Sequence, residues 1–312
     1  MLKLLLVFAV LAPWVVCAQV QHRTGSVHTL EVDLGYEVLG APGRGIPLIA
    51  VNGGPGLSHA YMMQNDLWQR IAARRLVVLY DQRGTGESKH VQANAAQSME
   101  AQVADLDAIR NALSLDRVAL LGDSYGGMIA MAYAAAHPEH IARLILSDSS
   151  APSWNSLVHL LPQVFPDREE QGEREGKALA ADTEAAAQAG LVNHMRMMFY
   201  SPDLRDTYLS HMGDLGFVPA IGEAVQRATK DIDLTPKLEG FRFPTLVING
   251  RYDMNVAPLT AWRIAHSIPG AEIVFFEKSG HLPAYEEPDK YLQVLNTFLA
   301  KEGAKAPQRG RK

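Results

Sequence analysis

The sequence predicts an α/β fold in which a mostly parallel sheet is covered by helices on both faces. Short apolar segments typical of buried strands alternate along the chain with longer segments of helical periodicity. One apolar segment, 118–121, runs directly into the G-x-S-x-G pattern of Gly122 to Gly126, which is typical of a sharp turn from strand to helix. At 312 residues the chain is long enough for one large domain that carries an insertion.

The first half of the chain supplies a predicted edge hairpin, buried strands and two helices. Alternation of apolar and polar residues over 27–38 predicts the hairpin. Continuous apolar runs predict strands that are buried on both faces, and apolar residues spaced from Met99 to Leu113 predict a helix with one buried face. The predicted strands are 45–51, 75–80, 118–121 and 142–146, and the predicted helices are 99–113 and 128–136.

The second half returns to the same alternation after an interruption. Strands are predicted at 245–249 and 272–276, and helices at 259–266 and 289–299. Residues 153–237 contain no strand-like run, so we predict a helical cap there, inserted into a core formed by 19–152 and 238–300. The clustered acids of the cap indicate a solvated helix face, and its methionines indicate internal packing.

The two ends of the chain are predicted to lie outside the folded domain. Residues 1–18 have the features of a secretory signal peptide, with Lys3 before a short apolar segment and compact residues, Val16-Cys17-Ala18, at the cleavage positions. We therefore expect an exported protein, periplasmic or secreted, and a retained membrane anchor is the alternative. The basic segment 301–312 is predicted to be a disordered tail.

Composition excludes several classes of function. The formal charge of −5 and the lack of a basic stripe argue against a nucleic-acid partner. Cys17 is the only cysteine, and a mature chain starting near Gln19 has none, which excludes a cysteine nucleophile. No pair of histidines has metal-ligand spacing with a carboxylate, so neither a metal nor a cofactor is predicted.

Ser124 is the candidate nucleophile, and it needs a base and an acid further along the chain. Gly122 and Gly126 permit the turn because a Cβ at either position would crowd the neighbouring backbone. In sheets of this kind the order is serine, acid, histidine. His281 follows the last predicted strand and is the candidate base, while Asp253 is the preferred acid and Asp148 the alternative.

The oxyanion formed by attack on a carbonyl needs backbone donors. One is predicted to be the amide of Tyr125, directly after the nucleophile, and the other the amide of Gly54 in the loop 52–56. Of the remaining polar residues, Asp81 is expected to pair with Arg83 and hold its loop.

Two further residues, Asp123 and His59, lie near these motifs. Asp123 is expected to point away from the chemistry. His59 follows the glycine-rich loop, so it could approach the pocket. The other histidines are expected to be surface or packing residues.

These motifs together resemble the α/β-hydrolase fold, and within it the prolyl aminopeptidase (proline iminopeptidase) family of serine peptidases. Asn52-Gly53-Gly54-Pro55-Gly56 is similar to the family's H-G-G-P-G, and residues 81–88 match its D-Q-R-G-x-G-x-S. The resemblance covers nearly the whole mature chain. It implies a triad of Ser124, Asp253 and His281, with Gly54 and Tyr125 as oxyanion donors, and a small peptide or ester as substrate.

The chain departs from the family pattern where substrate is bound. Asn52 replaces the histidine of the loop, beside Gly53. The resemblance implies that glutamates hold the substrate's amino group, yet Met254 follows the triad aspartate and Glu223 is the nearest candidate for the cap glutamate. The predicted function is therefore an aminopeptidase acting on small N-terminal residues. A carboxylesterase or lactonase with the same triad is the alternative, and a catalytically idle binding protein is a more remote one.

Overall fold

The computed structural model describes residues 20–43, 45–179 and 183–301, and its centre is a sheet in the strand order β1-β2-β4-β3-β5-β6-β7-β8. Strands β3 to β8 are parallel, whereas β1 and β2 form an antiparallel hairpin at one edge. The strands are β1 (His22–His28), β2 (Asp33–Leu39), β3 (Leu48–Val51), β4 (Val77–Tyr80), β5 (Val118–Asp123), β6 (Ile141–Ser147), β7 (Thr245–Gly250) and β8 (Glu272–Phe276).

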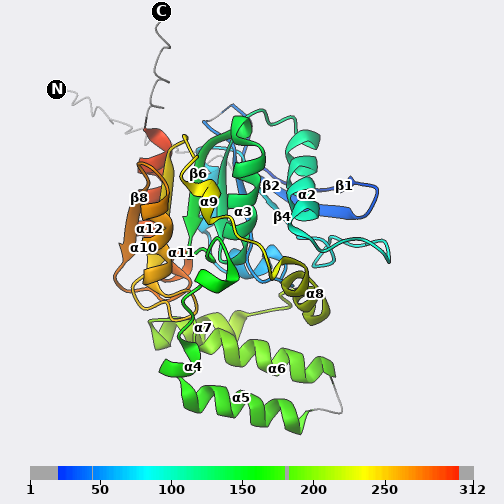
Figure 1. Ribbon diagram of the computed structural model, residues 1–312, viewed down its shortest axis with the longest axis vertical. Helices are drawn as coiled ribbons and strands as arrows, with labels where there is room; N and C mark the ends of the chain where they lie inside the picture. Colours follow the sequence, from blue (N-terminus) through cyan, green and yellow to red (C-terminus); the bar gives the residue numbers. More distant parts are fainter. Residues whose placement is uncertain (1–19, 44, 180–182, 302–312) are drawn as a thin grey trace, which may run out of the picture.

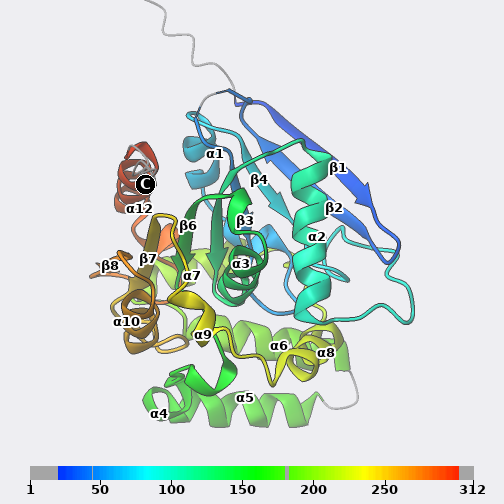
Figure 2. The same cartoon turned by 45° about the horizontal axis from the view of Figure 1, so that its top comes forward.

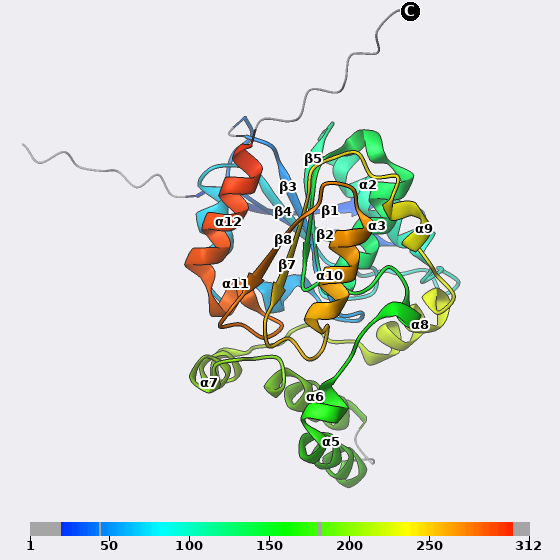
Figure 3. The same cartoon turned by 60° about the vertical axis from the view of Figure 1, so that its left-hand side comes forward.

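Helices cover both faces of this sheet, as Figure 3 shows for α12 on one side and α2, α3 and α10 on the other. The apolar side chains of β3 to β7 are almost all fully buried, because strands covered on both faces carry continuous apolar runs. One face packs on α2 (Met99–Ala112), α3 (Tyr125–Ala136) and α10 (Pro258–Ser267), and the other on α1 (Leu67–Ala72) and α12 (Pro288–Ala300). The predicted α/β fold is confirmed.

Between β6 and β7 the described residues form the helices α4 (Leu161–Val164), α5 (Pro166–Ala178), α6 (Thr183–Arg196), α7 (Pro202–His211), α8 (Pro219–Thr229) and α9 (Thr235–Leu238). Of these, α4 to α8 lie at one end of the sheet and α9 lies beside α3 (Figures 1 and 2). No strand of the sheet lies in this segment as far as the structure describes it. Apolar side chains of α4, α6 and α7, among them Met195, form a separate cluster that also includes Met198, whereas Val225 of α8 and Leu238 of α9 belong to the core beneath the sheet's other helices.

The predicted signal peptide and, apart from Lys301, the predicted tail lie outside the described residues. Within the described ranges, no helix is both long enough and apolar enough to cross a bilayer.

Candidate active site

Ser124 lies at the junction of β5 and α3, in a backbone conformation that few non-glycine residues adopt. Its φ is 52° and its ψ is −122°, which is a strained combination typical of functional positions. The turn depends on the flanking glycines as predicted. A Cβ on Gly122 would collide with the carbonyl of Gly126, and a Cβ on Gly126 would collide with the carbonyls of Val51 and Asn52.

His281 joins the serine to an aspartate. Its Nε2 lies 3.0 Å from Ser124 Oγ, and its Nδ1 lies 2.7 Å from Asp253 Oδ2. The other oxygen of Asp253 accepts hydrogen bonds from the backbone amides of Asn255 (2.9 Å) and Val256 (2.8 Å), which fix the carboxylate. The three residues predicted as a triad are therefore brought together, in the arrangement in which an imidazole takes a serine proton.

The surroundings of His281 favour a proton on its ring. Burial alone lowers the pKa of this imidazole, but the charge and hydrogen bond of Asp253, with the nearby Asp148 and Asp123, outweigh burial and raise the pKa to about 9. An imidazole with such neighbours is a stronger base, and the imidazolium formed during attack is stabilised.

Asp148, the alternative acid, lies beside the triad rather than in it. It is completely buried, and its Oδ1 accepts hydrogen bonds from Asn249 Nδ2 (2.9 Å) and from the amide of Gly250 (2.8 Å). Burial and the charge of Asp253 raise its pKa well above the ordinary value. Oxygens of both aspartates and a nitrogen of His281 lie within 4.8 Å of one another, but their hydrogen bonds to each other and to Asn249 already engage them.

The predicted oxyanion donors flank the serine. The amides of Gly54 and Tyr125 have no hydrogen-bond acceptor within the described part of the chain, and that of Tyr125 begins a helix whose first amides face outward. The neighbouring amide of Gly53 donates to Tyr61 Oη (2.6 Å), and that hydroxyl donates to Asp123 Oδ2.

Tyr61 and Asp123 thus position the oxyanion loop, a role that the sequence analysis missed. Burial raises the pKa of Asp123 to about 6, although its bond to Tyr61 opposes that shift. Asp123 points away from the chemistry as predicted, yet it orders the loop through the tyrosine. No sequence signal marks this link, because the two residues are 62 positions apart.

Two cavities meet at Ser124. The larger, about 440 Å³, lies between one face of α6 and one face of α8, and it is also lined by His281. The smaller, about 240 Å³, is lined by Tyr125 and Trp154, whose rings stack with centroids 5.9 Å apart. His194, on α6, lines both cavities.

Comparison with known proteins identifies the family. A family model described as alpha/beta hydrolase fold matches residues 46–288. The chain belongs to the α/β-hydrolase family. It is 30% identical over 267 residues to a proline iminopeptidase of Lactobacillus delbrueckii subsp. bulgaricus, covering 81% of this chain and 89% of that protein. A proline iminopeptidase of Clostridium botulinum is also 30% identical, over 89% of this chain and 98% of the relative, so the hydrolase is a member of the prolyl aminopeptidase-like family.

Solved structures agree on the fold of the hydrolase. An alpha/beta fold family hydrolase from Bacillus anthracis superposes with a TM-score of 0.72 at 24% identity, covering 89% of this chain and 99% of that one. The esterase RhEst1 from Rhodococcus gives 0.71 at 20% identity, over 91% of this chain and 99% of its own. An enol-lactonase from Burkholderia xenovorans gives 0.65 at 22% identity, over 89% and 100%. With the family shown, the chain is a serine hydrolase.

Of three residues predicted to bind substrate, Asn52, Met254 and Glu223, only Glu223 lines a cavity at Ser124. Asn52 is fully buried, and its Nδ2 donates to the carbonyls of Gly53 (3.0 Å) and Leu57 (2.8 Å), so it braces the loop from behind. Met254 packs on the cap's apolar cluster and does not line either cavity. Glu223 does line the larger cavity, where it pairs with Arg227 at 3.3 Å.

The predicted pairing of Asp81 with Arg83 is wrong. The guanidinium of Arg83 instead forms two 2.7 Å bonds with Asp105, while Asp81 Oδ1 accepts from Nδ1 of His59 at 2.7 Å. His59 Nε2 lies 3.3 Å from a carboxylate oxygen of Glu37, so this histidine faces the hairpin and does not line the pocket.

A buried glutamate ties the cap to the loop of the catalytic histidine. One oxygen of Glu286 accepts from the amides of Tyr200 and Ser201, each at 2.9 Å, and the other accepts from the amide of Gly280 at 2.7 Å. The amide of His281 itself donates to the carbonyl of Met198 at 2.6 Å. We refer to these contacts as the Glu286 clamp.

Proposed function

We propose that this hydrolase is an aminopeptidase that releases a small N-terminal residue from peptides through an acyl-enzyme. One observation carries the proposal: Glu223 is the single acidic side chain lining the cavity that holds Ser124, within the part of the chain that the structure describes. A substrate ammonium group taken from water needs a carboxylate partner, and Glu223 offers one. The proline iminopeptidases to which the chain is similar support the same activity.

The geometry supports a sequence of proton transfers around one serine. Ser124 Oγ attacks the carbonyl carbon while His281 Nε2, at 3.0 Å, accepts the hydroxyl proton. The amides of Gly54 and Tyr125 stabilise the oxyanion. The imidazolium then gives its proton to the leaving nitrogen as the C–N bond breaks, and water attacks the acyl-enzyme with the same imidazole as base.

The smaller cavity suits a compact side chain on the acyl side of the bond. Its walls combine the Trp154 and Tyr125 rings with Leu157 and Val256. An aromatic face packs well against a pyrrolidine ring or a methyl group.

A carboxylesterase or lactonase is the second candidate. It is favoured by the position of Met254 away from both cavities and by Arg227, which competes with any substrate amine for Glu223. In that case the free amino group would not matter for turnover.

The test compares proline and alanine anilides, their N-acetylated forms and short aryl esters. We expect anilide turnover that acetylation abolishes. Replacement of Glu223 by Gln should lower kcat/KM for free-amine substrates about two- to fivefold, because this carboxylate is largely exposed, and leave ester turnover unchanged. Glu173→Gln is the matched control, because Glu173 forms a similar i,i+4 pair with Lys177 on α5, away from both cavities.

Three other outcomes would contradict the proposal. Turnover of esters alone would establish the second candidate. Anilide turnover that acetylation leaves unchanged would remove the role of the amino group. If the protein neither turns over any of these substrates nor reacts with a fluorophosphonate, the remaining candidate is a catalytically idle binding protein.

A further inference from the structure

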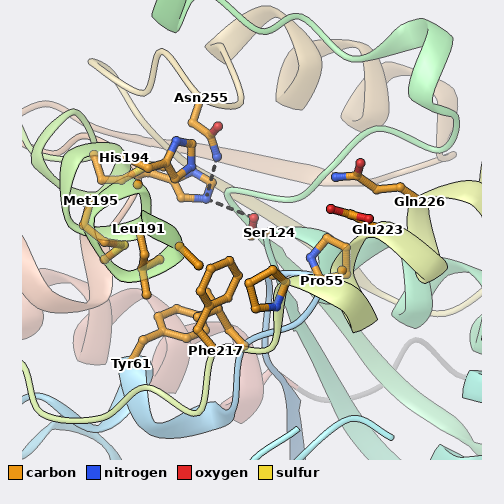
Figure 4. A pocket seen from close by; sticks show the side chains of 18 of the residues that line it. Pro55, Tyr61, Ser124, Leu191, His194, Met195, Phe217, Glu223, Gln226 and Asn255 are labelled. Atoms are coloured by element: carbon orange, nitrogen blue, oxygen red, sulfur yellow. Dashed lines mark hydrogen bonds between the residues drawn. The ribbon is translucent and has the colours of Figure 1, made fainter. Parts of the chain in front are cut away.

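The larger cavity has two chemically different ends. Figure 4 shows Glu223 and Gln226, both from α8, on one side of Ser124. Leu191 and Met195, both from α6, lie on the opposite side. One end can therefore receive a charged group, while the other is formed by aliphatic and thioether side chains.

The position of the imidazole decides which end receives the leaving group. In acylation the proton passes from His281 Nε2 to the leaving nitrogen, so that nitrogen departs on the side of this ring. His281 and the adjacent Leu282 line the larger cavity, whereas Tyr125, which carries an oxyanion amide, lines the smaller one. If Glu223 holds the amine, the chain beyond the scissile bond extends toward α6. This step rests on the proposed function.

The wall at that end is apolar and continuous with the packed interior of the cap. Leu191, Met195 and Met198 are 6%, 4% and 4% exposed and belong to one apolar cluster with Leu282. Burial and the nearby His281 and His159 lower the pKa of His194, on the same helix, to about 4, which leaves its imidazole neutral at pH 7. A charged side chain placed there would lose its hydration without a charged partner.

We propose that the residue following the scissile bond is recognised by the wall of Leu191, Met195 and Met198, so that the preferred substrates are peptides whose second residue is large and apolar. Methionine suits this task because its unbranched thioether adapts to side chains of different shape. The aminopeptidase is then selective on both sides of the bond that it cleaves.

The first experiment measures kcat/KM for a series of dipeptide amides, Pro-X-NH2, with the wild-type enzyme. The amide removes the terminal carboxylate, so that X is the only variable. We expect Leu, Met and Phe at X to exceed Asp and Lys by about tenfold to a hundredfold, since burial of such side chains is favourable and burial of a charge is not. Gly at X should lie between them.

The second experiment compares two methionine truncations in the same cluster. Met195 lines the cavity, whereas Met197 is equally buried, at 5% exposure, and does not line it. Met195→Ala should lower the Leu-to-Gly ratio of kcat/KM about tenfold, and Met197→Ala should leave the ratio unchanged. The ratio is independent of the fraction of folded enzyme, so loss of stability in either variant does not obscure the result.

The outcomes separate this inference from the proposed function. Cleavage of all members of the series at similar rates, or an unchanged ratio in Met195→Ala, overturns the inference and leaves the aminopeptidase intact. Turnover of aryl esters without turnover of any Pro-X-NH2 overturns both.

Discussion

Two histidine–aspartate pairs in this chain have the same distance between imidazole and carboxylate but different roles. His281 and Asp253 are joined by a 2.7 Å contact from Nδ1, and so are His59 and Asp81. Both imidazoles are buried, and neighbouring carboxylates outweigh burial to raise the pKa of each to about 9. The pairs differ in what faces the other ring nitrogen.

That second contact determines the function. Nε2 of His281 faces a serine hydroxyl that can lose its proton, whereas Nε2 of His59 faces the carboxylate of Glu37 at 3.3 Å. Between two carboxylates an imidazole remains a cation and acts as an ion-pair bridge. His59 therefore links the hairpin to the loop after β3, and His281 moves a proton. A histidine–aspartate pair alone does not identify a catalytic site.

The largest effects should come from removing the nucleophile or breaking the catalytic pair. Asp253→Asn is expected to lower kcat about 10⁴-fold, because the imidazole loses the partner that fixes its tautomer. Ser124→Ala should lower kcat about 10⁶-fold. Steady-state kinetics with intact folding, checked by circular dichroism, would test both, and activity above a tenth of wild type in either variant would refute the mechanism.

Breaking the structural pair should change stability and leave the chemistry in place. His59→Gln removes a bridge from Asp81 to Glu37 and should lower the free energy of unfolding by about 1–3 kcal/mol. Denaturant unfolding measures the loss, while kcat/KM of the folded variant should stay close to the wild-type value, because His59 does not line either cavity. A His59→Gln variant that is inactive but as stable as the wild type would show that His59 acts in catalysis and not in stability.

The two pairs should also respond to pH in opposite ways. Because the pKa of His59 is raised from 6.5 to about 9 in the folded protein, its protonated imidazole stabilises the folded state. This stabilisation is fully present below pH 6.5 and is lost as the pH rises through about 9. At 1.36 kcal/mol per pKa unit this contribution reaches about 3 kcal/mol, and His59→Gln should remove that part of the slope. Activity should instead rise with pH above 6.5, toward about 9, as His281 becomes neutral. Unfolding free energies and kcat/KM profiles between pH 6 and 10 measure the two trends.

The smallest effect is expected at the third carboxyl beside the catalytic pair. The hydrogen bonds that Asp148 accepts come from Asn249 and Gly250 and not from His281, and Asp148→Asn retains an oxygen for both donors. We expect kcat/KM to fall less than about tenfold, against about 10⁴-fold for Asp253→Asn. A loss as large as that of Asp253→Asn would show that both acids act on His281.

Strand-end motifs made much of this molecule predictable from the sequence. Ser124 directly follows β5, while Asp253 and His281 lie in the loops after β7 and β8, and parallel strands bring their carboxyl ends to one edge of the sheet. The partners of Asp81 were not predictable in this way. Arg83 is two residues away, yet it turns toward α2, while His59 approaches from the neighbouring strand's loop. Two residues that are close in sequence need not pair with each other when side chains of adjacent loops offer other partners.

The loop at 52–56 shows a similar limit. Its glycines predict an oxyanion site, but Tyr61 and Asp123, which hold the amide of Gly53, carry no motif. Asn52 was expected at the substrate because of its position in the motif, and the structure turns it into the loop instead. Side-chain direction within a tight loop depends on neighbours that the local sequence does not contain.

The Glu286 clamp has a mechanical consequence for access to the site. An outward swing of residues 198–201 must either break their bonds to Glu286 and His281 or carry the histidine loop along with the wall. In the second case His281 moves away from Ser124 and the general base is lost. The bonds that join Glu286 to the cap and to the histidine loop therefore couple the position of the cap wall to catalysis.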